Sequence, residues 1–118
     1  MKDRIKAIFF DVDSTLYYHG CHDILPSTRA ALNALHKQGI RIGIATSRCR
    51  SEMRNLPAFF RCFPFAGIIS DGGALVMEGK EIVEMHPLPK PLVRKIAALA
   101  KTYQRTLRYS MVLYRRAR

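Results

Sequence analysis

Apolar residues along the chain fall into short runs that predict alternating strands and helices. The continuous apolar run at 7–10 is typical of a strand buried on both faces, and the alternation over 40–44 predicts a second strand. Between them, apolar residues at i, i+3, i+4 and i+7 predict a helix that opens at Pro26 and ends at Gly39. Strand, helix and strand in this order predict a right-handed βαβ unit with two parallel strands.

The next stretch predicts a third parallel strand, followed by a change of direction. A helical segment at 51–61 contains Pro57, which should break or kink it because proline lacks a donor N–H. The strand expected at 66–70 ends in Asp-Gly-Gly, where paired glycines permit a tight turn. Residues 74–77 and 81–84 flank a glycine-containing turn and predict an antiparallel hairpin.

The last part of the chain predicts a proline-rich connector and a further helix. Pro91 suits the first turn of a helix, after which apolar residues recur on one face, and 107–114 could form a fourth strand. The expected fold class is α/β, with three parallel strands and flanking helices followed by a hairpin. At 118 residues such a sheet is short, so we expect at least one strand of the buried type to be poorly covered, with marginal stability or self-association.

The formal net charge of +11 is unevenly distributed. Residues 1–84 carry 11 Lys/Arg and 9 Asp/Glu, whereas residues 85–118 carry 9 Lys/Arg and no acidic residue. A basic stretch attracts nucleic acid or anionic lipid through counterion release. Because no nucleic-acid motif accompanies it, we interpret it as solvated charge and expect no specific nucleic-acid partner. A basic binder driven by residues 90–118 is the alternative.

Cysteine usage and hydropathy indicate a cytoplasmic protein with no membrane partner. Cys21, Cys49 and Cys62 are odd in number and form no Cys-x-x-Cys pair, which favours reduced thiols over a disulfide framework or a zinc site. The potential metal ligands within 19–23 fit no standard zinc spacing. No apolar stretch approaches transmembrane length, and the run at 7–10 is too short for a signal-peptide core.

Candidate chemistry follows the first expected strand, because ligands collect beyond the carboxyl ends of parallel strands. A carboxylate there can attack phosphorus, so Asp11 is the candidate nucleophile, and Asp13 is the candidate general acid and base. Ser14 and Thr15 add hydroxyls and backbone N–H groups that could hold phosphate oxygens. The second strand brings Thr46 to the same edge.

Asp-x-Asp alone also binds metal-nucleotides in glycosyltransferases, so the surrounding residues decide its interpretation. Residues 11–16 read Asp-Val-Asp-Ser-Thr-Leu and residues 45–48 read Ala-Thr-Ser-Arg. They resemble the Asp-x-Asp-Gly-Thr-Leu and Ala-Thr-Gly-Arg motifs of haloacid dehalogenase superfamily phosphatases, with Ser14 and Ser47 in place of glycine. Over about residues 4–105 the chain is most similar to the N-terminal part of the Cof-type (type IIB) members, whose cap is inserted after the third strand.

This resemblance implies Mg²⁺-dependent hydrolysis of a small phosphorylated metabolite through an aspartyl phosphate. It assigns Asp11 as nucleophile and metal ligand, and Asp13 as acid and base whose backbone carbonyl also binds the metal. The residues it implies for phosphate binding are Ser14, Thr15, Thr46 and Ser47. Where the family has asparagine after the third strand this chain has Asp71, a carboxylate that would repel phosphate.

The resemblance also implies that the chain is truncated. It places a partial core at 1–78 and the hairpin, the connector and the beginning of the cap at 79–118. The family's later lysine and acidic metal-binding loop follow the cap, so we expect slow or absent turnover from this chain. The alternative is an inactive homologue that acts as a binding or oligomerising module, as a homo-oligomer that covers its exposed sheet edge.

Overall fold

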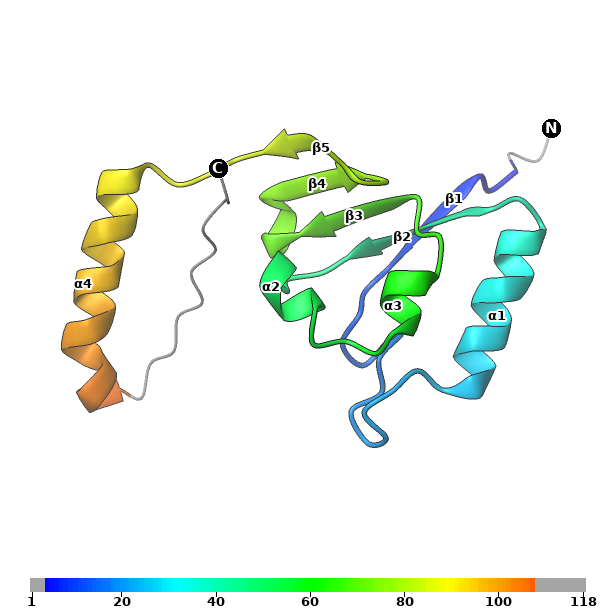
Figure 1. The fold of residues 1–118 in the computed structure, drawn as a ribbon, viewed down its shortest axis with the longest axis horizontal. Helices are drawn as coiled ribbons and strands as arrows, with labels where there is room; N and C mark the ends of the chain where they lie inside the picture. Colours follow the sequence, from blue (N-terminus) through cyan, green and yellow to red (C-terminus); the bar gives the residue numbers. More distant parts are fainter. Residues whose placement is uncertain (1–3, 108–118) are drawn as a thin grey trace. The chain divides into compact units, whose positions relative to one another are not determined.

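The structure, a computed structural model, describes the backbone of residues 4–107 and side chains through Tyr103 (Figure 1). The chain forms two compact units that divide between Met85 and His86. The first unit contains a sheet with its helices, and the second contains one long helix. The division into a family core and the beginning of a cap at residue 78 stays a prediction.

Five strands form one sheet in the first unit: β1 (Ala7–Phe10), β2 (Arg41–Ala45), β3 (Gly67–Ser70), β4 (Leu75–Glu78) and β5 (Glu81–Met85). Their spatial order equals their order in the sequence. β1, β2 and β3 run parallel, whereas β4 and β5 run antiparallel to their neighbours. The predicted α/β class, the three parallel strands and the hairpin are confirmed.

Three short-range signals place the helices of the first unit. Helix α1 (Pro26–Lys37) has proline in its first turn and is followed by Gly39, whose φ of +77° only glycine adopts without strain. Helices α2 (Arg50–Met53) and α3 (Phe59–Cys62) are separated at Pro57, as expected. A 3₁₀ turn, η1 (Asp71–Gly73), follows β3.

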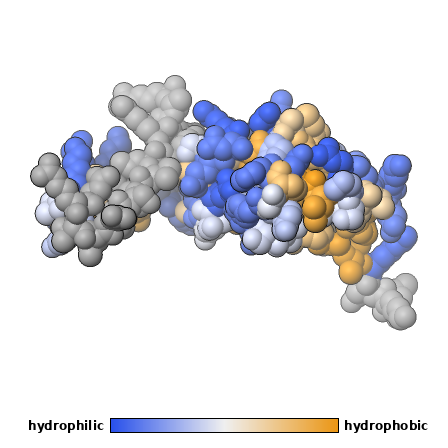
Figure 2. Space-filling model, turned by 90° about the horizontal axis from the view of Figure 1, so that it is seen from below, coloured by the Kyte–Doolittle hydropathy of each residue, from blue (hydrophilic) through white to orange (hydrophobic). Residues whose placement is uncertain are grey.

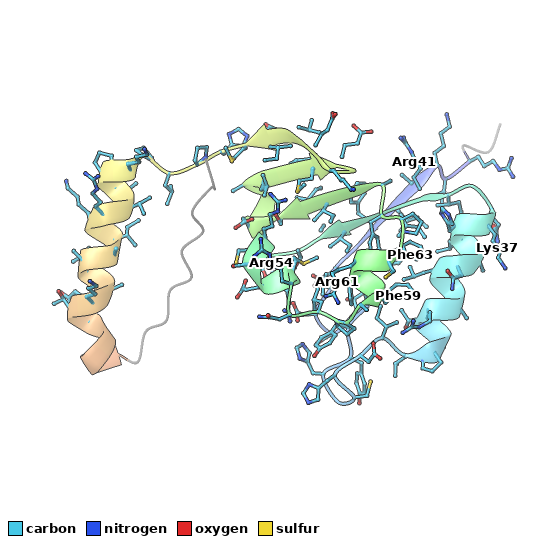
Figure 3. All side chains as sticks on the ribbon, viewed as in Figure 1. Lys37, Arg41, Arg54, Phe59, Arg61 and Phe63 are labelled. Carbon is cyan, nitrogen blue, oxygen red and sulfur yellow. The ribbon has the colours of Figure 1, made fainter. Side chains whose placement is uncertain are left out.

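The hydrophobic core lies on the face of the sheet that the helices cover. Ile42 and Ile44 of β2 are at most 1% exposed and pack with Leu32 of α1 and Phe60 of α3. Figure 3 shows Phe59 and Phe63 on the side of α3 that faces α1. Their rings stack with centroids 5.2 Å apart, and His36 and Arg29 of α1 lie against them. Aromatic packing therefore joins α1 and α3.

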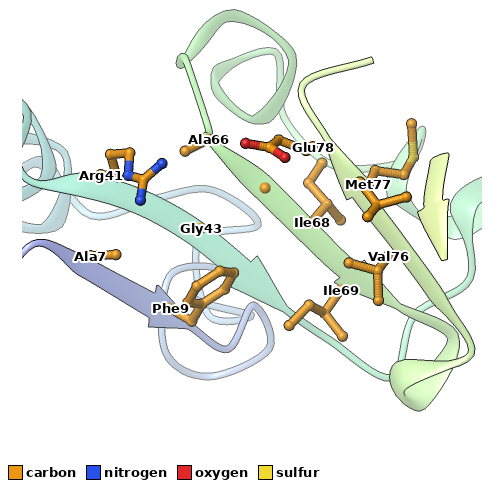
Figure 4. A pocket seen from close by; sticks show the side chains of 12 residues that line it. Ala7, Phe9, Arg41, Gly43, Ala66, Ile68, Ile69, Val76, Met77 and Glu78 are labelled. Atoms are coloured by element: carbon orange, nitrogen blue, oxygen red, sulfur yellow. The ribbon is translucent and has the colours of Figure 1, made fainter. Parts of the chain in front are cut away.

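The opposite face of the sheet is open in the first unit. Phe9 of β1 is 52% exposed, so the expectation that β1 is buried on both faces is wrong. Its ring lies across Gly43, where a Cβ would be 2.4 Å from a ring carbon, and borders a hollow of about 260 Å³ (Figure 4). Figure 2 shows apolar side chains, in orange, at the surface beside hydrophilic ones in blue. The prediction that at least one strand is poorly covered is confirmed at β1, and every residue of β5 is exposed as well.

The second unit contains helix α4 (Lys90–Leu107), which begins one residue before the predicted Pro91. Leu92, Leu99 and Tyr103 on its apolar side are between 43% and 57% exposed. The strand predicted at 107–114 lies outside the described residues except for Leu107, which ends α4. Among the helices described here, none has the length and hydropathy needed to cross a bilayer.

Candidate active site

Asp11 stands at the carboxyl end of β1, and its side chain is exposed to solvent. Its Oδ1 accepts a hydrogen bond from the backbone N–H of Val12 at 2.8 Å. Because Phe10 pairs with Ile44, the chain leaves β1 and β2 at the same edge of the sheet. Asp11 is therefore accessible to an incoming ligand at the edge where parallel strands present their loops.

A compact turn follows Asp11 and is anchored by Val12, whose side chain is fully buried. The Val12 carbonyl accepts hydrogen bonds from the N–H groups of Thr15, Leu16 and Tyr17 at 2.8–3.2 Å, and Ser14 donates its N–H to the Tyr17 carbonyl at 3.0 Å. The N–H groups of Ser14 and Thr15, which we expected to hold phosphate, are thus used inside the turn. Both residues are exposed.

Asp13 is held by an arginine from the loop after β2. Arg48 Nε donates to Asp13 Oδ2 at 2.8 Å and Arg48 Nη2 donates to Asp13 Oδ1 at 2.7 Å, a bidentate pair. His19 Nε2 lies 3.0 Å from the same Oδ1. The hydrogen bonds from Arg48 are the main reason that the pKa of Asp13 lies below its ordinary value. They also raise the pKa of Arg48.

The loop after β2 places Thr46 and Ser47 differently. Thr46 is buried, and its N–H donates to the Ile69 carbonyl at 2.8 Å, which continues the pairing with β3. Its Oγ1 accepts the N–H of Arg48 at 3.1 Å and so shapes the loop that presents the guanidinium. Ser47 is exposed beside it. Thr46 is therefore a buried support for the loop, whereas Ser47 faces solvent.

The turn after β3 closes against this loop. Asp71 donates its N–H to the Arg48 carbonyl at 3.0 Å, and Gly72 donates its N–H to the Thr46 carbonyl at 3.3 Å. Asp71 has a φ of +54°, a left-handed conformation that Asp tolerates better than most residues. Its Oδ2 accepts the hydroxyl hydrogen of Ser70 at 2.9 Å. The loops after β1, β2 and β3 are therefore linked to one another through Arg48.

The start of α2 keeps Arg48 in place. Glu52 Oε2 accepts the N–H of Cys49 at 2.9 Å, a reciprocal cap of the helix N-terminus that lowers the pKa of Glu52. Arg48 Nη1 in turn donates to the Glu52 carbonyl at 3.4 Å. The Tyr17 ring lies under the guanidinium, 5.7 Å from its carbon. Arg48 is thus held by Asp13, by α2 and by an aromatic ring.

Sequence reasoning assigned no role to Arg48 or His19. Arg48 stood in the Thr-Ser-Arg motif at the end of β2, and its position two residues after Thr46 was the available signal. His19 lay in the 19–23 cluster, where it contacts Asp13. Within the part of the chain that is described, no group of three or more His, Cys, Asp or Glu side chains is arranged to hold a metal ion.

The hollow on the open face of the sheet is separate from these loops. Its lining includes Ala7, Arg41 and Gly67, which lie at the amino ends of β1, β2 and β3. Asp11 and Arg48 lie beyond the carboxyl ends. The candidate site is therefore the surface formed by the three loops.

Comparison with known proteins gives consistent matches. A family model for haloacid dehalogenase-like hydrolases matches residues 8–117. A Mycoplasma pneumoniae protein named "Putative phosphatase" is 38% identical over 78 residues, which are 66% of this chain. A solved phosphatase of the haloalkanoate (HAD) superfamily from Bacteroides thetaiotaomicron is 31% identical over 85% of this chain, with a TM-score of 0.68. A solved sugar phosphatase of HAD subclass IIB is 33% identical over 82% of this chain, with a TM-score of 0.65.

The matched regions are a minor part of these proteins. The chain spans 27% of the length of the Mycoplasma protein, and 36% and 37% of the two solved structures. The loops after β1, β2 and β3 fall within the span of the family model.

Proposed function

Because the chain belongs to the haloacid dehalogenase-like hydrolase family, we propose that it supplies the nucleophile and the acid/base of a Mg²⁺-dependent phosphomonoester hydrolase. The observation that carries this proposal is the contrast between two carboxylates two residues apart. Asp11 is exposed and free to approach phosphorus, whereas Asp13 is oriented by two hydrogen bonds from Arg48. Two carboxylates in unlike environments suit two different chemical roles.

The proposed reaction has two steps. In the first, a carboxylate oxygen of Asp11 forms a bond to phosphorus as the bond from phosphorus to the ester oxygen breaks, and Asp13 gives its proton to the leaving alkoxide. In the second, water attacks the same phosphorus, Asp13 takes the water proton, and the acyl phosphate bond breaks. The products are inorganic phosphate and the Asp11 carboxylate, and the proton has returned to Asp13.

Arg48 determines the protonation state of Asp13 before substrate binds. In the free site the guanidinium stabilises the ionised carboxylate and keeps the pKa of Asp13 low. An incoming phosphate dianion competes for the guanidinium and disfavours a second negative charge nearby, which raises the pKa of Asp13 toward protonation. Substrate binding therefore favours protonation of Asp13. We propose that Ser14, Thr15, Thr46 and Ser47 bind the phosphate through their hydroxyl groups, because the N–H groups of Ser14, Thr15 and Thr46 are already used within the fold.

The donor atoms present suit a weakly held Mg²⁺ ion. The Asp11 carboxylate is exposed, and the side chain of Asp13 is engaged by Arg48, which leaves its backbone carbonyl as the second oxygen. Mg²⁺ is commonly bound by one or two carboxylates together with substrate phosphate and water. When bound, the ion would offset the negative charge that carboxylates and phosphate bring together.

The substrate class that fits is a small phosphorylated metabolite. The exposed loops present hydroxyls and one guanidinium, groups that recognise phosphate without selecting the alcohol. We assign residues 79–118 to the hairpin, the connector and the beginning of the cap that selects the alcohol in this family. The comparisons do not favour the alternative of an inactive binding module.

Covalent trapping tests the proposal without requiring rapid turnover. The chain is incubated with p-nitrophenyl phosphate and Mg²⁺, quenched in acid, and examined by intact mass and peptide mapping. We expect a phosphoryl adduct on Asp11 that hydroxylamine removes. Asp11→Asn should form no adduct, and the matched control Asp23→Asn should form it as the parent chain does. An absent adduct, or one that persists in Asp11→Asn, contradicts the proposal.

A further inference from the structure

The two oxygens of the Asp13 carboxylate face different sets of hydrogen-bond donors. Oδ1 lies 2.7 Å from Arg48 Nη2 and 3.0 Å from His19 Nε2, whereas Oδ2 accepts the N–H of Arg48 Nε at 2.8 Å. An ionised carboxylate can only accept hydrogen bonds, so His19 Nε2 carries the hydrogen in this contact. A histidine from the loop after β1 therefore shares Asp13 Oδ1 with Arg48.

Tyr17 packs against both of these donors. Its ring meets the His19 ring edge to face, with centroids 4.8 Å apart, and the guanidinium carbon of Arg48 lies 5.7 Å from the Tyr17 ring centroid. The backbone of Tyr17 belongs to the turn after β1, because its N–H donates to the Val12 carbonyl at 2.8 Å. His19 therefore packs on the same turn that carries Asp13.

The two donors differ in how they can respond to a bound phosphate. The Arg48 guanidinium has five N–H groups in a planar fork that suits phosphate as well as carboxylate, so an incoming phosphate dianion competes for it. His19 uses the hydrogen on Nε2 for Asp13 Oδ1 and has no second hydrogen on that nitrogen. When the guanidinium turns toward phosphate, the bond from His19 therefore remains to hold Asp13.

We propose that His19 is a positioning residue that directs the acidic proton of Asp13 to Oδ2, an inference that rests on the proposed hydrolysis. Oδ1 is occupied by the N–H of His19, so the proton is held by the other oxygen. In the first step this proton passes from Oδ2 to the ester oxygen as the bond from phosphorus to that oxygen breaks, which leaves Asp13 ionised. Because Oδ1 keeps its hydrogen bond, the carboxyl group stays oriented for the second step.

The need for the Asp13 proton depends on the leaving group, which gives a test specific to this role. p-Nitrophenolate leaves as a stabilised anion, whereas phenolate depends on protonation by a general acid. Rapid-quench experiments with p-nitrophenyl phosphate and with phenyl phosphate, each with Mg²⁺, measure how fast the phenol is released as the Asp11 adduct forms. His19→Ala should slow the release of phenol about 10-fold and that of p-nitrophenol about 2-fold or less. A general loss of folding or of phosphate binding would slow both equally.

Two further variants separate positioning from other effects on the loop. His19→Gln keeps an N–H donor of similar reach and should restore most of the rate with phenyl phosphate. His22→Asn removes the other imidazole of this loop, whose Nδ1 lies 3.5 Å from the Tyr17 hydroxyl, and should leave the ratio of the two rates unchanged. Asparagine suits this position because His22 has a φ of +54°. Circular dichroism verifies that each variant is folded.

Histidine-selective ¹⁵N NMR tests the contact in the absence of phosphate and metal. Asp13→Asn replaces a charged acceptor by a neutral amide and should shift the His19 Nε2 resonance. The resonances of His36, which lies on α1 against Phe63, should not move and provide the control. A His19 resonance that does not respond to Asp13→Asn overturns the contact and the proposal with it.

Failure of this inference can be distinguished from failure of the proposed function. A parent chain that forms no adduct on Asp11 overturns both. If His19→Ala keeps the parent's ratio of the two rates, the role of His19 alone is overturned, and the same holds if His19→Gln is no faster than His19→Ala with phenyl phosphate. A selective loss with phenyl phosphate that His19→Gln restores supports the proposal.

Discussion

Side chains on the two faces of the sheet resemble each other in chemistry and differ in surroundings. Ile42 and Ile44 face the helices and are at most 1% exposed, whereas Phe9 on the opposite face is 52% exposed. Gly43 and Gly67 form the floor of that opposite face. The alternation of apolar residues fixes which side chains share a face, but the elements that lie across from the face decide whether it is buried.

Truncating one phenylalanine on each face gives the largest contrast. Phe60→Ala removes a ring that is 7% exposed and should lower the free energy of unfolding by about 3–4 kcal/mol. Phe9→Ala removes a ring with half of its surface in solvent and should cost about 1 kcal/mol or less. Urea denaturation, monitored by circular dichroism, measures both. Similar losses at the two sites would contradict the assignment of an open face.

Arg48→Gln probes the polar link between the loops that follow β1 and β2. Losing two charge-assisted hydrogen bonds at a partly exposed site should lower the free energy of unfolding by about 1–1.5 kcal/mol at pH 7. The neighbouring exposed Arg50→Gln is the matched control and should change little. An equal loss in the control would show that general charge, and not the Asp13 contact, is responsible.

The same variant predicts a pH dependence. The folded pKa of Asp13 lies below its ordinary value because of Arg48, and the unfolded value is about 3.9. The stabilisation is therefore fully present above about pH 5 and is lost as the pH falls through the folded pKa. The difference between the parent chain and Arg48→Gln should shrink at pH 3.5 and below. A difference that stays constant to pH 3 would contradict this account.

Alanine substitutions at Gly43 and Gly67 test whether the atoms next to each added Cβ can move aside. Its Cβ would lie 2.4 Å from a carbon of the Phe9 ring, which can swing into the open face, so we expect a loss of about 1 kcal/mol. In a Phe9→Ala background this loss should disappear. At Gly67 the added Cβ would lie 3.2 Å from the Met77 carbonyl oxygen, and the loss caused by Gly67→Ala should persist in that background. If Phe9→Ala abolished the loss of stability at both glycines, the strands themselves would have to shift.

The smallest expected effect concerns the turn that follows β1. Ser14 has a φ of +62°, so Ser14→Gly should relieve left-handed backbone and raise the free energy of unfolding by about 0.5 kcal/mol. Ser47, the other serine in place of a family glycine, is not among the residues with positive φ. Ser47→Gly should therefore destabilise by a similar amount. Thermal denaturation of both variants provides the measurement, and a gain at Ser47 would contradict the reasoning.

Local patterns in the sequence were sufficient to predict the strands, the proline break between α2 and α3, and the change from parallel to antiparallel order. They also located Asp11 and Asp13 beyond the first strand. These predictions depend on residues close in sequence or on the general rule for parallel strands. The exposure of Phe9 could not be predicted in this way, because it depends on what packs across the sheet.

Details of the candidate site were less accessible to sequence reasoning. The contact between Asp13 and Arg48 joins residues 35 positions apart, and no local pattern specifies which side chain an arginine will reach. The N–H groups of Ser14 and Thr15 turn inward because the Val12 carbonyl collects the hydrogen bonds of the turn. Whether a backbone donor faces a ligand or its own turn is set by dihedral angles that residue types constrain weakly.

The long sequence separation of the Asp13–Arg48 contact also has a consequence for the order of folding. The β4–β5 hairpin closes through a two-residue turn, which is a microsecond event, whereas the two loops of the candidate site meet after α1 and β2 have docked. We expect pulse-labelling hydrogen exchange to protect the amides of β4 and β5 before that of Arg48. The candidate site would then acquire its geometry late, so a partly refolded molecule has the β4–β5 hairpin before it has the site.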